Sequence, residues 1–389
     1  MKIPMSSPDL DDADRQAVID VINTPILSLG PRVVEFEKAF CAYTGAKYAV
    51  AVNSGTAGLH LCVRAAGIGA GDMVITTPFS FVASTNALLF ENAVPIFVDV
   101  DPRTGNIDPQ QVAQAAQDLS NGGKTAEKWL PRSGRPSGKL KALLPVDVFG
   151  QPAALEDILA TARQYGLTVI EDSCEALGAE HKAKKAGTYG DFGIFAFYPN
   201  KQMTTGEGGL IISDDEAAVN LMRALRNQGR APGDTWLSHT YLGYNYRLDE
   251  MSAAMGITQV KRLDAMLAKR EQVAGWYAER LSEIPGLEIP IVVPDTTRMS
   301  WFVYVIRLAQ AIDRTDLARR LEARGVPIRP YFLPIHLQPY MVERFGYREG
   351  DFPVTEDLGR RGVAVPFSGV MSEAQVEYVC EALRMEIAG

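Results

Sequence analysis

Between residues 47 and 214, short β-rich apolar runs alternate with helical patterns. Runs of this kind, separated by helices, are typical of a mostly parallel sheet that is covered by helices on both faces. The sequence therefore predicts an α/β fold for this part of the chain. The expected strands read YAVAVN, MVITTPF, AVPIFVDV, KALLPVDV, LTVIEDS, FGIFAFY and GLIISD.

The pattern changes after residue 284. Helical spacing covers 216–227 and, at greater length, 249–284. It is followed by one strand, SWFVYVIRL, one helix, TDLARRLEARG, and a last helix over 373–387. We expect a large domain over residues 1–284, with an N-terminal helical segment, and a smaller C-terminal α+β domain over residues 285–389.

One stretch inside the large domain, residues 120–139, is polar and rich in Gly, Pro and basic residues. Because it precedes an expected core strand, it predicts a surface insertion. A loop that binds a polyanion is the alternative interpretation.

Composition excludes several classes of protein. The chain has 389 residues, is 47% hydrophobic and carries a net charge of -8, with no basic stripe that would indicate a nucleic-acid surface. No apolar run reaches the length of a membrane span, and MKIPMSSPDLDDADRQ is not a signal peptide, so we expect a cytoplasmic protein. The cysteines form no CxxC pair and the histidines show no ligand spacing, which predicts reduced thiols and no metal site.

The stretch NSGTAGLHL, residues 53–61, carries the first chemical signal. An expected strand ends there, small residues turn the chain, and a helix begins. The backbone N–H groups at the start of a helix, with the helix dipole behind them, suit a phosphate. The same Ser-Gly-Thr sequence is also a good helix N-cap, and the residues alone do not decide between the two interpretations.

The second signal is TVIEDSCEALGA, where an apolar strand delivers Glu171 and Asp172 to its carboxyl end. Ligands of open α/β sheets bind at these strand ends. A carboxylate there could bind a ribose hydroxyl, a metal ion or a protonated ring nitrogen. A helix N-cap is the structural alternative.

The third signal is FAFYPNKQMTTGEGG, which places Lys201 just after an apolar strand. Most lysines are solvated surface charges. A lysine that is desolvated at the edge of a crevice can instead attack a carbonyl carbon and form a Schiff base. A phosphate turn, a strand-end aspartate and a strand-end lysine, in that order, fit pyridoxal 5'-phosphate (PLP), which has a phosphate, a pyridine nitrogen and an aldehyde.

Eight motifs in order along nearly the whole chain resemble those of the DegT–StrS family of sugar aminotransferases. They are GPRVVEFEKAF, NSGTAGLHL, TTPFSFVAS, PVDVFGQPA, EDSCEALGA, FYPNKQMTTGEGG, YNYRLDEMSAAMGITQ and RPYFLPIHLQPY. The motif texture resembles that of perosamine-synthase-like nucleotide-sugar 4-aminotransferases. The resemblance implies a fold type I PLP-dependent transferase, an α/β protein with a mostly parallel sheet.

The resemblance also implies roles for individual residues. Lys201 matches the catalytic lysine that forms the Schiff base with PLP, and Asp172 matches the carboxylate that pairs with the pyridine nitrogen. Gly55 and Thr56 match the phosphate-binding turn, and Phe81 matches an aromatic residue that stacks on the cofactor ring.

The resemblance implies roles for five further residues. Glu175 stands near the ring hydroxyl, where relatives often have Gln or His. Asn245 matches an asparagine that reaches the cofactor phosphate of the partner subunit, which implies a homodimer with shared active sites. Arg230, Arg247 and His336 are candidates for binding the sugar or its diphosphate.

One position departs from the family. Many relatives have a serine that helps bind the phosphate where this chain has Ala196. The contact that this serine would make is in doubt here, and Thr56, Gln202 or water are its candidate substitutes.

The implied reaction moves an amino group from L-glutamate to a nucleotide-linked keto-sugar, with pyridoxamine phosphate as the intermediate. A 4-keto-6-deoxyhexose is the expected acceptor, and a 3-keto-sugar or keto-cyclitol is the alternative. Lysine at 201 favours transamination, because a dehydratase branch of the family has histidine there. A non-catalytic PLP-binding regulatory protein is the alternative from another class.

Overall fold

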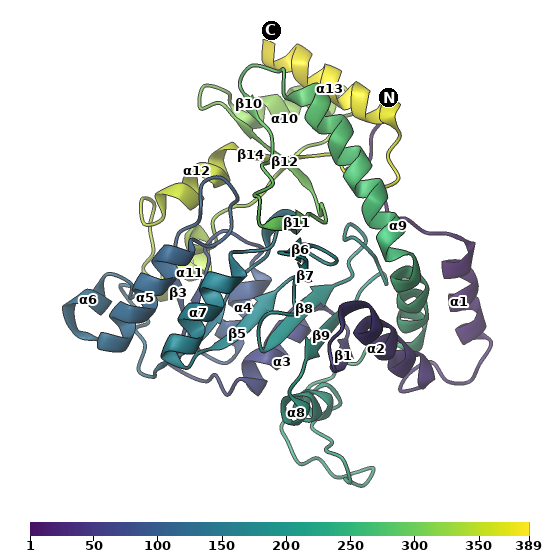
Figure 1. The fold of residues 1–389 in the computed structure, drawn as a ribbon, viewed down its shortest axis with the longest axis vertical. Helices are drawn as coiled ribbons and strands as arrows, with labels where there is room; N and C mark the ends of the chain where they lie inside the picture. Colours follow the sequence, from purple (N-terminus) through teal and green to yellow (C-terminus); the bar gives the residue numbers. More distant parts are fainter. Residues whose placement is uncertain (389) are drawn as a thin grey trace.

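A computed structural model describes residues 1–388 of the chain. Its centre is a seven-stranded sheet (Figure 1), in which β9 alone runs against its neighbours and the remaining pairs are parallel. The mostly parallel α/β sheet that the sequence predicts is therefore confirmed. In spatial order the strands are β1 (Tyr48–Val52), β9 (Gly209–Ser213), β8 (Phe192–Ala196), β5 (Thr168–Asp172), β4 (Leu140–Leu144), β2 (Met73–Thr76) and β3 (Val94–Phe97).

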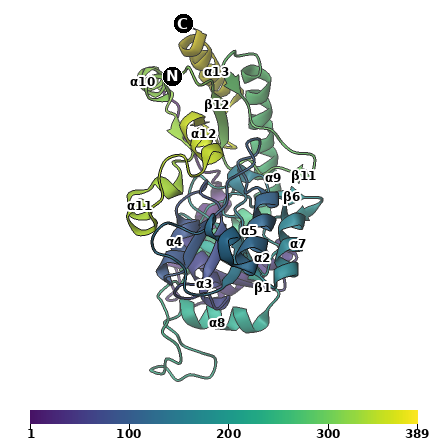
Figure 2. The same cartoon turned by 90° about the vertical axis from the view of Figure 1, so that its left-hand side faces the viewer.

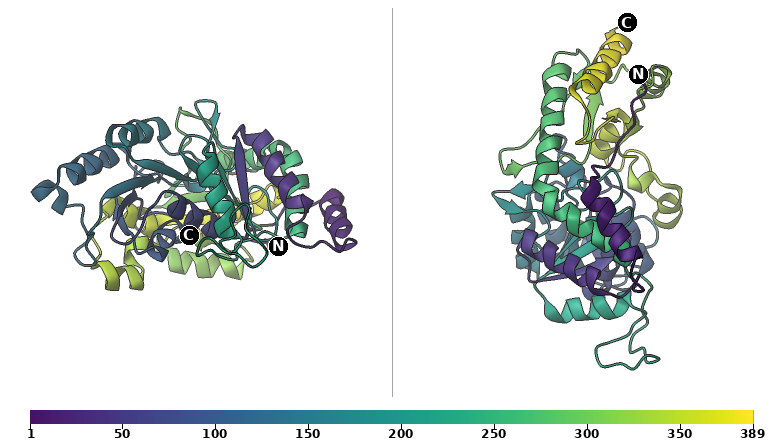
Figure 3. Two further views of the ribbon diagram at one scale, coloured as in Figure 1. Left: turned by 90° about the horizontal axis from the view of Figure 1, so that it is seen from below. Right: turned by 90° about the vertical axis from the view of Figure 1, so that its right-hand side faces the viewer.

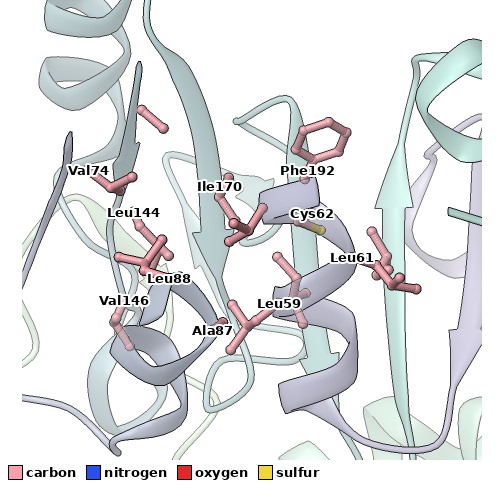
Figure 4. Packing of buried hydrophobic residues seen from close by; sticks show 14 of the residues in the cluster. Leu59, Leu61, Cys62, Val74, Ala87, Leu88, Leu144, Val146, Ile170 and Phe192 are labelled. Atoms are coloured by element: carbon pink, nitrogen blue, oxygen red, sulfur yellow. The ribbon is translucent and has the colours of Figure 1, made fainter. Parts of the chain in front are cut away.

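Helices cover both faces of the sheet. One face packs against α3 (Gly55–Ala65), α4 (Ala83–Phe90) and α8 (Glu216–Arg226), and Figure 4 shows Leu59 and Cys62 of α3 packed against Ile170 of β5. The other face packs against α2 (Pro31–Thr44), α5 (Pro109–Asn121), α7 (Leu155–Tyr165) and the first half of α9 (Glu250–Leu281). Adjacent strand residues such as Val169 and Ile170 enter opposite cores, as strand geometry requires.

The C-terminal part is built on a four-stranded antiparallel sheet in the order β10 (Leu287–Glu288), β12 (Tyr304–Leu308), β14 (Gly362–Val365) and β13 (Arg329–Pro330). Helices α10 (Arg314–Ala323) and α13 (Glu373–Ala388) pack beside it (Figure 2). The sequence predicted β12 and both helices but not the other strands, which are two to four residues long and too short for a periodic signal. The remaining α-helices and strands are α1 (Asp12–Ile22), α6 (Gly123–Glu127), β6 (Glu180–His181), β7 (Lys184–Lys185), β11 (Thr296–Arg298), α11 (Pro339–Phe345) and α12 (Pro353–Arg361), and two short 3-10 helices cover Val148–Gly150 and Ile335–Leu337.

The hydrophobic clusters do not divide at residue 284. Helix α9, 32 residues long, packs Leu263 with the large-domain core and Tyr277 with the C-terminal core, and Figure 3 shows it running along both parts. Ile3 joins the C-terminal core, whereas Met341 and Phe345 of α11 pack against the large sheet. The boundary at 284 stays a prediction, because the chain crosses between the two cores several times.

Residues 120–139 are more structured than the predicted surface insertion. Ala126 is buried, and the indole N–H of Trp129 donates a hydrogen bond to Asp118 at 2.9 Å. Of its basic side chains, Arg132 forms an ion pair with Asp351 at 2.5 Å. Because Lys128 and Arg135 are also ion-paired, with Asp118 and Glu127, these charges do not favour the polyanion-binding alternative.

Within the residues that the structure describes, we searched for membrane-spanning helices and for metal sites. None of the helices within residues 1–388 is both long and apolar enough to cross a membrane. Over the same residues, the structure brings together no group of three His, Cys, Asp or Glu side chains that could hold a metal ion.

The contact between α2 and the sheet gives a test of this fold. Phe36 is fully buried and packs edge-on against Phe197 at 5.5 Å between ring centroids. We expect Phe36→Ala to lower the free energy of unfolding by roughly 3–5 kcal/mol, because the surrounding core cannot collapse into the cavity. The control Lys38→Ala, on the exposed side of the same helix, should change it by less than about 0.5 kcal/mol. Thermal and denaturant unfolding measure both, and equal losses would contradict this packing.

Candidate active site

A pocket of about 430 Å³ lies where the carboxyl ends of the parallel strands meet the C-terminal part of the chain. Such strand ends are the usual ligand site of an open α/β sheet. Its lining side chains come from the turn before α3, from the ends of β5 and β8, and from two C-terminal segments. They include Ser54, Gly55, Thr56, Phe81, Ser84, Asp172, Cys174, Glu175, Ala196, Tyr198, Asn200, Lys201, Phe302, Tyr331 and Phe332.

The start of α3 forms one end of the pocket. Ser54 is the N-cap, and its hydroxyl accepts a hydrogen bond from the Ala57 N–H at 3.1 Å. The N–H groups of Gly55 and Thr56 have no intrahelical acceptor, because they belong to the first turn. A Cβ on Gly55 would lie 2.8 Å from Cβ of Ala196, so glycine lets the helix start this close to β8. The N-cap and the anion-site interpretations therefore apply to the same turn.

Asp172, the last residue of β5, is 4% exposed and lines the pocket. Its Oδ2 accepts a hydrogen bond from the Ser84 hydroxyl at 2.6 Å, and its Oδ1 accepts one from the Cys174 N–H at 3.2 Å. Neither contact caps a helix, so the structural alternative for Asp172 is wrong. No motif in the sequence indicated Ser84 as its partner.

Glu171 points to the opposite side of the strand. Its carboxylate accepts hydrogen bonds from three backbone N–H groups, those of Gly187, Tyr189 and Gly190, at 2.5 to 2.7 Å. Burial, together with the nearby charge of Asp147, raises the pKa of Glu171 above its usual value. Of the two neighbouring carboxylates, only Asp172 is therefore available to a ligand in the pocket.

Lys201 is not a solvated surface charge. Its side chain is 13% exposed, and its Nζ lies 3.9 Å from Oε1 of Glu175. The same Nζ lies 3.8 Å from the centroid of the Phe302 ring. The amine is thus held against an aromatic wall, with one carboxyl group as its nearest charged partner.

Glu175 lies deep in the pocket. It is 5% exposed, and its Oε2 accepts a hydrogen bond from the Phe149 N–H at 2.9 Å. Burial raises its pKa to about 7, although the charge of Lys201 opposes the rise. Glu175 is therefore a carboxyl group that can change its protonation state near neutral pH.

Of the other positions discussed for cofactor binding, Phe81 and Ala196 line the pocket, whereas Gln202 does not. Phe81 lines the mouth of the pocket with 62% of its surface exposed, and Ala196 lines the wall where many relatives have serine. Gln202 is turned away, because its amide donates to the Glu175 carbonyl and to the Ser300 hydroxyl. Of the two candidate side chains, only Thr56 therefore lines the pocket.

Asn245 lies outside this pocket, on an extended segment with an exposed side chain. Its neighbours Tyr244 and Tyr246 point inward, as alternation in an extended chain requires. There the Tyr246 hydroxyl lies 3.0 Å from Nδ1 of His60, and Nε2 of His60 lies 2.8 Å from Oε1 of Glu91. The segment is thus fixed to α3 with Asn245 facing away from its own chain.

Arg230 and Arg247 also lie outside the lining of the pocket. Arg230 stacks on Trp236 at 4.7 Å, in the loop that projects beyond α8 at the bottom of Figure 1. Arg247 donates a hydrogen bond to the side chain of Asn227 at 3.0 Å.

The position of His336 contradicts its predicted role in binding the sugar or its diphosphate. The ring is fully buried, and its Nε2 lies 3.0 Å from Oε1 of Glu356. It also packs edge-on against Phe352 at 4.8 Å. A substrate in the pocket cannot reach a side chain that is enclosed in this way.

The pocket fits PLP. A ring that carries a phosphate, a basic nitrogen and an aldehyde needs an anion site, a carboxylate and an amine. The start of α3, Asp172 and Lys201 supply these three groups around one pocket. Phe302 and Phe332 add aromatic walls to the pocket.

Comparisons with known proteins agree with the fold. Residues 8–384 match the model of the DegT/DnrJ/EryC1/StrS aminotransferase family. The chain is 36% identical to the GDP-perosamine synthase of Caulobacter vibrioides over 385 residues, which cover 98% of this chain and 97% of that protein.

Two solved structures extend the comparison. Helicobacter pylori PseC, an aminotransferase involved in the biosynthesis of pseudoaminic acid, superposes with a TM-score of 0.89 at 26% identity and covers 100% of both chains. DesV of S. venezuelae, solved in complex with a ketimine intermediate, gives a TM-score of 0.86 at 29% identity and covers 99% of this chain and 98% of that chain.

The fold and the pocket define a fold type I PLP-dependent transferase. The chain belongs to the DegT/DnrJ/EryC1/StrS family, and it is a PLP-dependent sugar aminotransferase.

The raised pKa of Glu175 predicts how stability depends on pH. In the unfolded chain the carboxyl ionises near 4.5, whereas in the folded chain it stays protonated up to about 7. The protonated form therefore stabilises the fold below 4.5, and this contribution is lost as the pH rises through 7. We expect cofactor-free wild type to lose about 3 kcal/mol of stability relative to Glu175→Gln between pH 4.5 and 8.

Thermal unfolding at pH 5, 6, 7 and 8 measures this difference. Glu283→Gln, at an exposed position, is the control and should stay parallel to wild type. A difference between wild type and Glu175→Gln that does not change with pH would contradict the burial of an ionisable carboxyl at 175.

Proposed function

We propose that the protein transfers an amino group from L-glutamate to a nucleotide-linked keto-sugar, and that Lys201 holds PLP covalently in the pocket described above. The observation that carries the proposal is the convergence of Lys201, Asp172 and the start of α3 on one pocket. When bound, the cofactor would supply an electron sink that stabilises negative charge on the carbon losing its proton.

Each residue has a role that follows from its place. The carboxylate of Asp172, fixed by the Ser84 hydroxyl, would accept a hydrogen bond from the ring nitrogen and favour its protonated form. The N–H groups of Gly55 and Thr56 would bind the phosphate with the dipole of α3. Phe81 would stack on the ring from the mouth of the pocket.

Lys201 would act as the base and then the acid. Its amine lies 3.8 Å from the centroid of the Phe302 ring, and its side chain is 13% exposed. Once released from its covalent partner, it would take a proton from Cα of the amino donor and return one to the aldehyde carbon of the cofactor, which the donor nitrogen separates from Cα. Glu175, 3.9 Å away, would balance the charge of the amine through this cycle.

The acceptor is proposed to be a nucleotide-linked 4-keto-6-deoxyhexose. The 36% identity with a GDP-perosamine synthase over nearly the full length supports it, as does the lysine at 201. A 3-keto-sugar or keto-cyclitol is the second candidate. A mass-spectrometric screen of nucleotide-linked keto-sugars with L-glutamate tests the choice, and the expected product is a sugar in which an amino group replaces the 4-keto oxygen.

A regulatory protein that binds PLP without turnover is the candidate from another class. The intact Lys201 and Asp172 in an accessible pocket favour catalysis. The two are distinguished by adding L-glutamate to the protein loaded with PLP, since only an enzyme should change the absorption spectrum of its cofactor.

The active unit is proposed to be a homodimer in which Asn245 reaches the phosphate site of the partner. The outward direction of Asn245 supports this, because its own chain offers it no place in the pocket. Apolar side chains exposed on the N-terminal segment give a surface for a second copy to cover. They are Ile19, Ile22, Ile26, Leu27, Leu29 and Val34, each 46–59% exposed.

We expect Lys201→Ala to lower turnover by roughly 10³-fold while leaving a folded protein that still binds PLP, because only the covalent anchor and the proton carrier are lost. Asp172→Asn should lower both PLP affinity and the rate of conversion with glutamate, since an amide stabilises a ring cation less well than a carboxylate. Lys47→Ala, at an exposed position, is the control. A Lys201→Ala protein within tenfold of wild-type turnover would exclude Lys201 as the catalytic base.

Mixing two defective chains tests the shared site. Lys201→Ala and Asn245→Asp should each be nearly inactive, the latter because a negative charge would face the phosphate. In a mixed dimer, one site keeps its own Lys201 and receives Asn245 from the partner. Random mixing makes about half of the dimers mixed with one working site each, so activity should recover to about a quarter of wild type. No recovery, with mixed dimers shown by native mass spectrometry, would place Asn245 in its own site.

A further inference from the structure

Arg270, in the middle of α9, is a buried arginine with an unusual set of partners. It is 4% exposed, and its guanidinium donates four hydrogen bonds, all to main-chain carbonyl oxygens. Two acceptors belong to Asn200 and Lys201, at 3.2 and 2.6 Å. The other two belong to Trp301 and Phe302, at 3.0 and 3.2 Å.

This arginine is not part of an ion pair with any of these acceptors. Burial lowers the pKa of Arg270 to about 10, and the charge of Asp9 opposes this only in part. Arg262, two turns earlier on the same helix, instead contacts the carboxylates of Asp9, Asp11 and Asp14 at 2.7 to 3.1 Å. A buried cation is costly unless its donors are satisfied, so the four carbonyl contacts are what keep Arg270 in place.

The two segments that Arg270 joins are about a hundred residues apart and form opposite parts of the pocket. One carries Lys201, and the other carries Phe302, whose ring centroid lies 3.8 Å from Nζ of Lys201. Both residues line the pocket. A single planar group therefore fixes the backbone of the lysine and the backbone of the aromatic side chain against which its amine rests.

We propose that Arg270 is a positioning residue for the amine of Lys201. Its guanidinium group holds the main chain at residues 200–201 and at residues 301–302 in a fixed relative position. This relative position determines where the amine of Lys201 lies with respect to Phe302, Glu175 and the bound cofactor. The inference rests on the proposed role of Lys201. Misplacement of a reacting group by about 1 Å can cost 10²-fold in rate, so a clamp at this point affects the reaction without touching the substrate.

Lysine is not expected to replace Arg270. The guanidinium offers donors in a rigid planar fork, whereas an ammonium group is a compact point that reaches fewer acceptors. Arg270→Lys keeps the charge and loses the fork. Arg270→Met keeps the length and loses both.

The experiment compares these two variants with wild type and with Arg280→Met, on the same helix, as a matched control. The first measurement needs no amino donor: the rate at which the cofactor-free protein acquires the absorbance of bound PLP. The second is the single-turnover rate of the loaded protein with L-glutamate, as a function of its concentration. Thermal unfolding of each protein is recorded alongside.

We expect both Arg270 variants to acquire PLP absorbance at least ~10-fold more slowly and to convert it at least ~30-fold more slowly, whereas the glutamate concentration for half the maximal rate changes less than ~3-fold. Arg280→Met should unfold at a lower temperature but keep both rates within ~2-fold of wild type, because its ion pair joins α9 to Glu373 of α13, away from the pocket and from the N-terminal segment.

A folded Arg270→Lys protein with wild-type rates would overturn the inference. So would failure of Arg270→Lys to fold, because Arg270 would then be a core residue that the fold requires whatever its effect on Lys201. If wild type itself acquires no PLP absorbance, the role of Lys201 fails first, and this outcome is distinct from an effect confined to the Arg270 variants.

Discussion

The parallel strands of the central sheet end at one edge, and the pocket depends on this constraint. β1, β5 and β8 run in the same direction, so the residues that follow them meet although they lie far apart in the sequence. The start of α3 follows β1, Asp172 ends β5, and Lys201 follows β8. An anion site, a carboxylate and an amine are thereby placed around a single cavity by strand direction alone.

Burial gives these groups their chemical properties. Low solvent access strengthens each interaction inside the pocket and penalises each charge that lacks a partner. Asp172 therefore has two hydrogen-bond donors, and Glu175 has a raised pKa. Arg270 keeps its charge beneath the pocket through carbonyl oxygens.

Periodicity and motif order were enough to predict the sheet, the flanking helices and the groups at the pocket. Contacts between distant segments could not be predicted in this way. Ser84 lies in a family motif that does not indicate its partner, and Arg270 carries no local signal, since only the tertiary structure brings near the groups that they contact. His336 was misassigned because its motif resembles that of the family, whereas its burial depends on how α12 packs. The short strand β14 lacked the length that periodicity needs.

The covalent bond between Lys201 and PLP is the central claim, and it can be tested directly. The protein would be loaded with PLP, reduced with borohydride, digested and mapped by mass spectrometry. We expect the phosphopyridoxyl group on the peptide that contains Lys201 and on no other peptide at stoichiometric yield. A stoichiometric label on a different lysine, with the Lys201 peptide unmodified, would contradict the account.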